Sequence, residues 1–157
     1  ILMHQYKTEQ WLPISLQEAW HFFSSPKNLA LITPPELGFK ILTQLNGEEI
    51  YEGMKIDYKV RPLLGIPVHW RTEICRVEKE EFFTDRQEIG PYKVWEHTHY
   101  FIEQNGGTLM RDEVNYLLPF GAMGKMVHSI FVKRKIENIF HFRRNILNKL
   151  FIQNDTH

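Results

Sequence analysis

The chain has little cysteine, no excess of either charge and no long apolar run, and each absence excludes a class of protein. Its 157 residues include one cysteine, Cys75, so no disulfide can form within the chain. Lys and Arg number 19, as do Asp and Glu, so no overall charge attracts the chain to nucleic acid. No apolar stretch approaches about 18 residues, and no basic start leads into an apolar signal core. We therefore expect one domain, residues 1–157, that is soluble and cytoplasmic.

Motifs for covalent catalysis and for nucleotide binding are also missing. Cys75 has no His or acid at the spacing of an activated nucleophile, which indicates an unreactive thiol on the outer face of a strand. No glycine-rich phosphate cradle, internal repeat or low-complexity tract is present. We therefore expect no cofactor, and any chemistry would have to be proton transfer on a bound organic molecule.

Hydrophobic periodicity predicts an α+β domain. A strand at 4–12 precedes two short helices, one opened by the capping box Ser15–Glu18 and one by Ser25-Pro26. Six further strands follow, in the segments 39–44, 54–61, 67–77, two stretches between 82 and 104, and 108–118. Residues 122–151 form a helix of about 30 residues whose second half carries one apolar stripe, while the first half faces a drifting direction. Only this helix can cover the shared face, so we predict a curved antiparallel sheet of about seven strands wrapped around it.

The hairpin closed by Asn105-Gly106 fixes which residues share a face. This pair is typical of a type I′ turn, since both positions favour positive φ. The resulting register pairs Phe101 with Met110, His99 with Asp112, His97 with Val114, and Trp95 with Tyr116. The opposite face of these strands is polar, so these eight residues point inward.

The preceding hairpin adds further polar groups to the inner face. A loop over 78–81 sets Glu73 opposite Arg86 and Arg71 opposite Glu88 on the outer face. Asp85 and Gln87 then point inward, beside the aromatic ring of Trp70. Polar groups held inside a sheet must be paired or hydrated.

Two arrangements of the inward polar groups are open. His97 and His99 project to one side of a strand, as metal ligands do, but only Asp85 or Gln87 could complete the set. We therefore favour a hydrogen-bonded network, in which Asp112 orients His99, and predict no metal. Arg143, within the apolar stripe of the helix, is expected to reach solvent rather than to pair with Asp85 or Asp112.

The sequence also resembles a known family over nearly its whole length. The stretch Pro13–Phe23, with Asn28-Leu29 and Thr33-Pro34, is similar to the opening strand and paired helices of the SRPBCC superfamily, which has the START and birch-pollen-allergen helix-grip fold. The run from Phe83 to Asp112 resembles an uncharacterised bacterial subgroup related to polyketide cyclase/dehydratase-like proteins. The resemblance implies a helix-grip fold with a cavity for a hydrophobic ligand between sheet and C-terminal helix. No residue set matches a characterised cyclase residue by residue.

Two functions use the same inner face. The favoured one is binding of a small hydrophobic or lipid-like ligand, with aromatic side chains around it and polar groups fixing its head group. The expected binding residues are Tyr58, Trp70, Asp85, Gln87, Trp95, His97, His99, Phe101, Asp112 and Tyr116. The alternative is a cyclase/dehydratase-type enzyme using His99, Asp112 and Tyr116 as an acid–base set.

A third class is a protein or membrane interaction module. The loops at Leu31-Ile32, 63–66 and Pro119-Phe120 are unusually apolar. Residues 121–151 hold seven Lys or Arg against one acid, Glu137. We favour a role for these charges in complementing the acidic body of the same protein, so membrane contact is the less favoured alternative.

Overall fold

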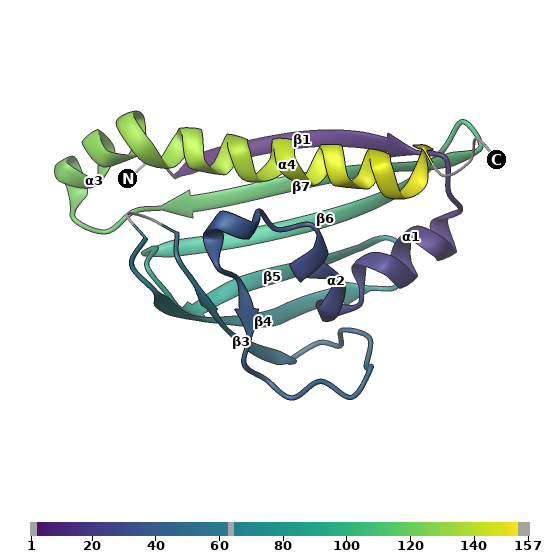
Figure 1. Cartoon of the computed structure of the whole chain (residues 1–157), viewed down its shortest axis with the longest axis horizontal. Coiled ribbons are helices and arrows are strands. Elements are labelled where there is room, and N and C mark those ends of the chain that lie inside the picture. The colour runs from purple at the N-terminus through teal and green to yellow at the C-terminus, as the bar shows by residue number, and fades with distance from the viewer. Residues whose placement is uncertain (1–2, 63–64, 154–157) are drawn as a thin grey trace.

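The computed structural model describes residues 3–62 and 65–153, and in this part of the chain seven strands form one antiparallel sheet. The strands are β1 (His4–Leu12), β2 (Lys40–Ile41), β3 (Lys55–Val60), β4 (Val68–Glu78), β5 (Phe82–Ile89), β6 (Val94–Gln104) and β7 (Gly107–Leu117). Their spatial order is β1-β7-β6-β5-β4-β3-β2, so only β1 leaves its place in the chain order. The predicted curved sheet is confirmed (Figure 1).

The helices lie on one side of this sheet, and their order is as predicted. They are α1 (Leu16–Phe23), α2 (Pro26–Leu31), a 3₁₀ turn at Pro35–Leu37, α3 (Gly121–Val127), a π-helical turn at His128–Val132, and α4 (Lys133–Phe151). The Ser15 side chain accepts a hydrogen bond from the Glu18 backbone at 3.1 Å, which confirms the cap of α1. In Figure 1, α4 lies along β1 and β7. Helix α1 contacts β6 and β7, and α2 contacts α1 and β2. No helix in the described residues is both long and apolar enough to cross a bilayer.

The register of the β6–β7 hairpin is the predicted one. His99 pairs with Asp112, His97 with Val114, and the turn residues Asn105 and Gly106 have φ of 51° and 73°. Positive φ at both positions is what a type I′ turn requires, and this local requirement explains why the register could be read from the sequence.

The β4–β5 hairpin departs from the prediction at two irregularities. Glu73 pairs with Arg86 as predicted, but a register shift next to Thr72 places Arg71 opposite Ile89 instead of Glu88. Arg71 instead donates to Asp57 at 2.9 Å. The second shift occurs at Cys75, whose Sγ donates to the Thr84 carbonyl at 3.5 Å. Burial raises the pKa of the Cys75 thiol, which suits an unreactive residue.

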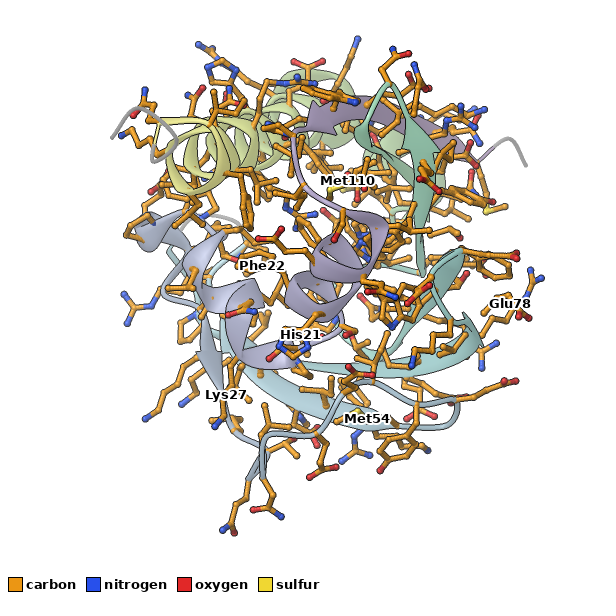
Figure 2. The ribbon with its side chains drawn as sticks, turned by 90° about the vertical axis from the view of Figure 1, so that its right-hand side faces the viewer. His21, Phe22, Lys27, Met54, Glu78 and Met110 are labelled. Carbon is orange, nitrogen blue, oxygen red and sulfur yellow. The ribbon has the colours of Figure 1, made fainter. Side chains whose placement is uncertain are left out.

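The core fills the space between sheet and helices. Its larger cluster includes Leu12, Trp20, Phe83, Phe101 and Leu147. A smaller cluster groups Val114 and Tyr116 of β7 with Val132, Ile136 and Phe140 of the C-terminal helix. Figure 2 shows this interior filled with side chains, while Lys27 and Glu78 extend outward.

A π-helical turn separates α3 from α4. A π turn contains one residue more than an α turn, so the side chain on the same side of the helix comes after five residues instead of three or four. The buried stripe runs from Val132 through Ile136 and Phe140. Val127 of α3, five residues before Val132, is partly buried and packs against the same cluster, whereas Met123 and Met126 are exposed. This change of spacing accounts for the drifting direction seen in the sequence.

Candidate functional site

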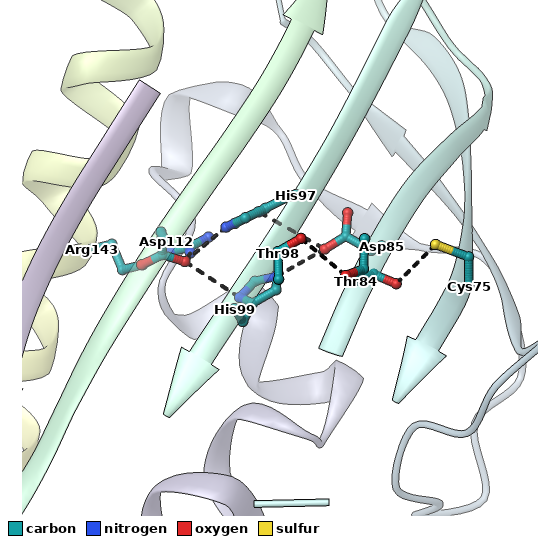
Figure 3. A network of polar contacts seen from close by, with 8 residues as sticks. All are labelled: Cys75, Thr84, Asp85, His97, Thr98, His99, Asp112 and Arg143. Carbon is teal, nitrogen blue, oxygen red and sulfur yellow. Dashed lines mark hydrogen bonds and ion pairs between the residues drawn. The ribbon is translucent and has the colours of Figure 1, made fainter. Parts of the chain in front are cut away.

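A cluster of charged and titratable side chains is buried between the sheet and α4. Asp85 comes from β5, His97 and His99 from β6, Asp112 from β7, and Arg143 from α4 (Figure 3). All five side chains are at most 16% exposed. The inward polar residues predicted from the two hairpins therefore do meet in space, together with Arg143.

Each imidazole pairs with a carboxylate on a neighbouring strand. His97 Nε2 donates to Asp112 Oδ1 at 2.7 Å, and His99 Nε2 donates to Asp85 Oδ2 at 2.8 Å. The two rings stack with their centroids 3.7 Å apart. The network predicted from sequence is therefore present, but Asp112 bonds to His97 and Asp85 orients His99.

Arg143 does not reach solvent as the sequence led us to expect. It is 8% exposed, its Nη1 lies 3.6 Å from Asp112 Oδ1, and its guanidinium lies 4.9 Å from the Phe140 ring centroid. The reason is its position: α4 presents this face to the sheet, where a carboxylate compensates the buried charge. Its Nε is buried with no hydrogen-bond partner among the described residues.

The carboxylates are held ionised and His99 is held neutral. Burial alone would raise the pKa of Asp112, but the hydrogen bond from His97 and the nearby charges hold it far below its usual range. Asp85 behaves alike: burial opposes ionisation, and the bond from His99 outweighs it, so the pKa is lowered. Burial is also the largest influence on His99, and with His97 beside it lowers the pKa to about 4.

A small cavity opens beside this cluster. Its volume is about 60 Å³, and Asp85, His99 and Arg143 contribute to its wall. The rest of the wall is mainly apolar, from Phe22, Phe23, Leu29, Ile32, Ile56 and Tyr58. One water needs about 10–15 Å³, whereas pockets for organic ligands usually exceed about 300 Å³. The cavity as it stands holds a few waters or a small organic group.

The ten predicted binding residues lie in three places. Tyr58, Asp85 and His99 line the cavity, and His97 and Asp112 lie directly beside it in the cluster. Phe101 packs in the core, 5.2 Å from the Trp20 ring. Their separation follows from strand length, since Trp95 and Phe101 are six residues, or about 20 Å, apart along β6.

The other predicted residues form an aromatic cluster at the far end of the sheet. Trp70 and Trp95 meet edge to face at 5.5 Å, and Tyr116 lies 6.1 Å from Trp95. Gln87 exchanges two hydrogen bonds with the backbone of Tyr92, which joins the same cluster. These side chains contact one another, away from the cavity.

The sequence interpretation missed the helical half of the cavity wall. Phe22 and Leu29 come from α1 and α2, which were predicted as helices without a role in the site. Arg143 carried a usable signal: a cation inside an apolar stripe, three residues after Phe140, needs an anion on the facing sheet.

Three of the polar residues could also hold a metal ion. Asp85, His97 and His99 each offer one ligand atom, and these atoms lie within 4.8 Å of one another, with Asp112 bonded to His97. However, His99 Nε2 already donates to the Asp85 carboxylate, and Arg143 adds a positive charge nearby. We therefore favour the hydrogen-bonded arrangement.

Comparisons with known proteins show the fold. No protein-family model matches the chain, and no curated protein matches its sequence. Among solved structures, protein Ms6760 from Mycobacterium smegmatis is 14% identical with a TM-score of 0.65, over 96% of this chain and 98% of that one. Ara h 8.0201 is 15% identical with a TM-score of 0.58, over 94% and 99%.

A third match is part of a larger protein. The nucleoside-diphosphate sugar epimerase from Corynebacterium glutamicum is 22% identical with a TM-score of 0.61, and 92% of this chain matches 28% of that one. At these identities the likeness extends to the fold alone.

Proposed function

Because the chain has the helix-grip fold of the SRPBCC superfamily, we propose that it binds a small, mainly apolar molecule in the cavity between sheet and helices. The observation that carries the proposal is the Nε of Arg143, a buried donor without a partner in the described part of the chain, on a residue of the cavity wall. A buried donor left unpaired costs about 1–3 kcal/mol. A ligand oxygen that accepted from Nε would remove this cost.

The charges of the cluster favour an uncharged ligand. The two ionised carboxylates of Asp85 and Asp112 lie beside one guanidinium, that of Arg143, so these three side chains carry a net charge of −1. An anionic head group would therefore lie beside two carboxylates without a net positive partner. A ketone, ester or amide oxygen accepts the same hydrogen bond without this repulsion.

The size of the cavity requires its helical wall to move for a larger ligand. Helix α2 has six residues, and its Ser25 makes no side-chain capping bond. Its main contacts are to α1 and the two-residue strand β2. Displacing α2 breaks the bond from Asn28 to the Phe22 carbonyl and uncovers Leu29, and it enlarges the cavity on the side formed by Leu29 and Ile32.

Native mass spectrometry of the protein purified without added ligand is the first test, followed by extraction to identify any retained molecule. A series of methyl ketones of increasing chain length then supplies a defined probe, with binding measured by calorimetry. We expect affinity to rise with chain length, because each added methylene is buried.

The variant Arg143→Lys keeps the positive charge but removes the Nε donor. We expect it to weaken ketone binding about tenfold or more, the value of one hydrogen bond to a charged group. Arg144→Lys is the matched control, since Arg144 bonds to Thr8 and the Glu9 backbone outside the cavity. No retained molecule together with no ketone binding would overturn the proposal.

In the acid–base alternative, the carboxylates and Tyr116 are poorly suited to the role of proton donor. Both carboxylates have lowered pKa values, and the Tyr116 hydroxyl pairs with His128 Nε2 at 2.6 Å. If the site is nevertheless catalytic, Asp112→Asn would abolish turnover of a bound molecule and leave its affinity within a few fold.

A further inference from the structure

A second surface of the protein is apolar, exposed and unrelated to the cavity. It lies on the first half of the C-terminal helix and the turn before it, and we name it the 120–131 apolar face. Its exposed side chains are Phe120 (81%), Met123 (65%), Met126 (58%), Ile130 (58%) and Phe131 (52%). Large apolar side chains gathered in this way mark an interaction surface rather than ordinary scattered exposure.

Phe120, the most exposed of these side chains, has an unfavourable backbone conformation. Phe120 has φ of 73°, a left-handed conformation that a bulky residue rarely adopts. It is the last residue of the connection between β7 and α3, through which the chain passes from the sheet to the C-terminal helix. Figure 1 shows this connection below α3. The strained conformation therefore belongs to a residue whose side chain faces solvent.

An apolar pocket of about 280 Å³ adjoins this face. Tyr92, Leu118 and Val127 contribute to its wall, and so do the exposed side chains of Phe120 and Met123. The pocket therefore continues the exposed apolar surface inward. Its size suits the end of a hydrocarbon chain better than a polar group.

Positive charges flank the 120–131 apolar face. Lys133, Arg134 and Lys135 are exposed directly after it, and Lys125 is exposed within it. The single acid of residues 121–151, Glu137, comes after the basic run. Apolar side chains bordered by cations are the composition of a helix that lies in the interface of an anionic bilayer.

We propose that the 120–131 apolar face docks on an anionic lipid surface, with Phe120 and Met123 entering the interface and the basic run contacting lipid phosphates. A second copy of the chain is a poorer occupant, because the same surface of that copy carries the same cations and has no acid among residues 121–135 to pair with them. This revises the sequence interpretation, which assigned the basic charges to the acidic body of the protein. The proposal does not depend on the proposed ligand function.

Of the other apolar loops, Leu31 is exposed and Ile32 is buried. Ile66 is exposed, and residues 63–64 lie outside the described part of the chain. The proposal therefore rests on Phe120 and the helix after it.

Cosedimentation with vesicles tests the proposal on the full chain. One set of vesicles contains phosphatidylcholine alone, and the other an equimolar mixture with phosphatidylglycerol. We expect binding to the mixed vesicles at low ionic strength, loss of that binding at high ionic strength, and little binding to phosphatidylcholine. No sedimentation with the anionic vesicles at low ionic strength would overturn the proposal.

Two variants with matched controls locate the surface. Phe120→Ser with Met123→Ser removes the inserted side chains, and Leu42→Ser with Tyr51→Ser removes two other exposed side chains, from the β2–β3 connection. Lys133→Glu with Lys135→Glu reverses the charge of the basic run, and Lys40→Glu with Lys59→Glu is its control. We expect each surface variant to weaken binding about tenfold or more, and the controls to leave it unchanged.

All substituted side chains are exposed, so the variants should retain the fold, which circular dichroism checks. Equal loss in the variants and their controls would overturn the proposal. Sedimentation equilibrium supplies the other decisive result: a dimer that Phe120→Ser converts to monomer would assign the face to a second copy of the chain instead.

Discussion

Asp112 lies opposite His99 in the strand register, yet its Oδ1 is 2.7 Å from Nε2 of His97 and 3.4 Å from Nδ1 of His99. The reason is the proton of His99. A neutral His99 that donates through Nε2 to Asp85 has no proton on Nδ1, so it cannot donate to Asp112. The diagonal bond to His97 results, and the two pairs together connect β5, β6 and β7.

This arrangement predicts that, as pH is lowered, the protein begins to lose stability before its carboxylates take up protons. The pKa of His99 is 6.5 when unfolded and about 4 in the fold, so between these values the unfolded state binds one proton more. Stability must therefore decrease as pH falls through this interval, by up to about 1.4 kcal/mol per pH unit. Asp85 and Asp112, with lowered pKa values, contribute a further loss below about pH 4. Urea unfolding across this range measures the slope.

His99→Gln isolates the contribution of this imidazole. The amide can still donate to Asp85 but takes up no proton, so we expect a flatter dependence of unfolding free energy on pH between about 4 and 6.5. His21→Gln, at an exposed site of α1, should retain the original slope. Equal slopes in wild type and His99→Gln would contradict the assignment.

The contact between Arg143 and Asp112 should appear as energetic coupling. Arg143→Met and Asp112→Asn each leave one buried charge without its partner, which should lower the free energy of unfolding by about 3 kcal/mol. The double variant should therefore cost clearly less than the two single costs added together. A cycle of urea unfolding measurements gives the coupling energy.

The exposed pair of Arg111 and Glu9, at 2.9 Å, is the control for this cycle. Arg111→Met and Glu9→Gln should couple by less than about 1 kcal/mol, since water screens the contact. Additive costs at Arg143 and Asp112 would mean that the buried contact contributes little.

Trp95→Ala tests whether the aromatic cluster is packed core or the wall of an open cavity. Its ring contacts Trp70, Tyr92 and Tyr116, so truncation should cost about 3 kcal/mol. Tyr51→Ala, at a side chain 54% exposed, should change stability by less than about 0.5 kcal/mol. A melting temperature of Trp95→Ala equal to that of wild type would show that the ring lines open space.

Gly107→Ala should destabilise the junction of β1 and β7. An added Cβ would collide with the Leu12 carbonyl oxygen and lie 2.6 Å from the Trp11 ring, so the strands must part. We expect a cost of about 1–3 kcal/mol in thermal unfolding. At Gly90 the atoms nearest to an added Cβ belong to the Gln87 side chain rather than to backbone. Gly90→Ala should therefore break the two bonds of Gln87 to Tyr92 without parting two strands, and should cost less.

The parts of the structure that could be predicted from the sequence are those set by neighbouring residues. Asn105-Gly106 determines the β6–β7 register by its own backbone preference, and Ser15 caps α1 through the next turn of chain. The two β4–β5 irregularities have no such local signal. At Cys75, the sequence shows an ordinary alternating strand, and the shift depends on contact with Thr84 across the sheet.

Only the part of the site that lies on strands could be predicted, because the alternation of side chains along a strand decides which face each one occupies. Parity placed Asp85, His97, His99 and Asp112 on one face, but which imidazole meets which carboxylate depends on protonation. The narrowness of the cavity depends on how α1 and α2 pack against the sheet. Which carboxylate Arg143 meets depends on how α4 is rotated against the sheet. Both depend on contacts between segments that are far apart in the sequence.

The direction in which α3 presents its apolar side chains depends on the number of residues in the π-helical turn at His128–Val132 and on the geometry of that turn. It does not depend on which side chains the turn contains. If the same residues of this turn were α-helical instead, the extra residue would rotate everything before it by about 100° relative to α4. Phe120 and Met123 would then point to a different side, with every side chain of the face still present. The two halves of the helix can accordingly change in sequence independently, so long as their spacing is kept.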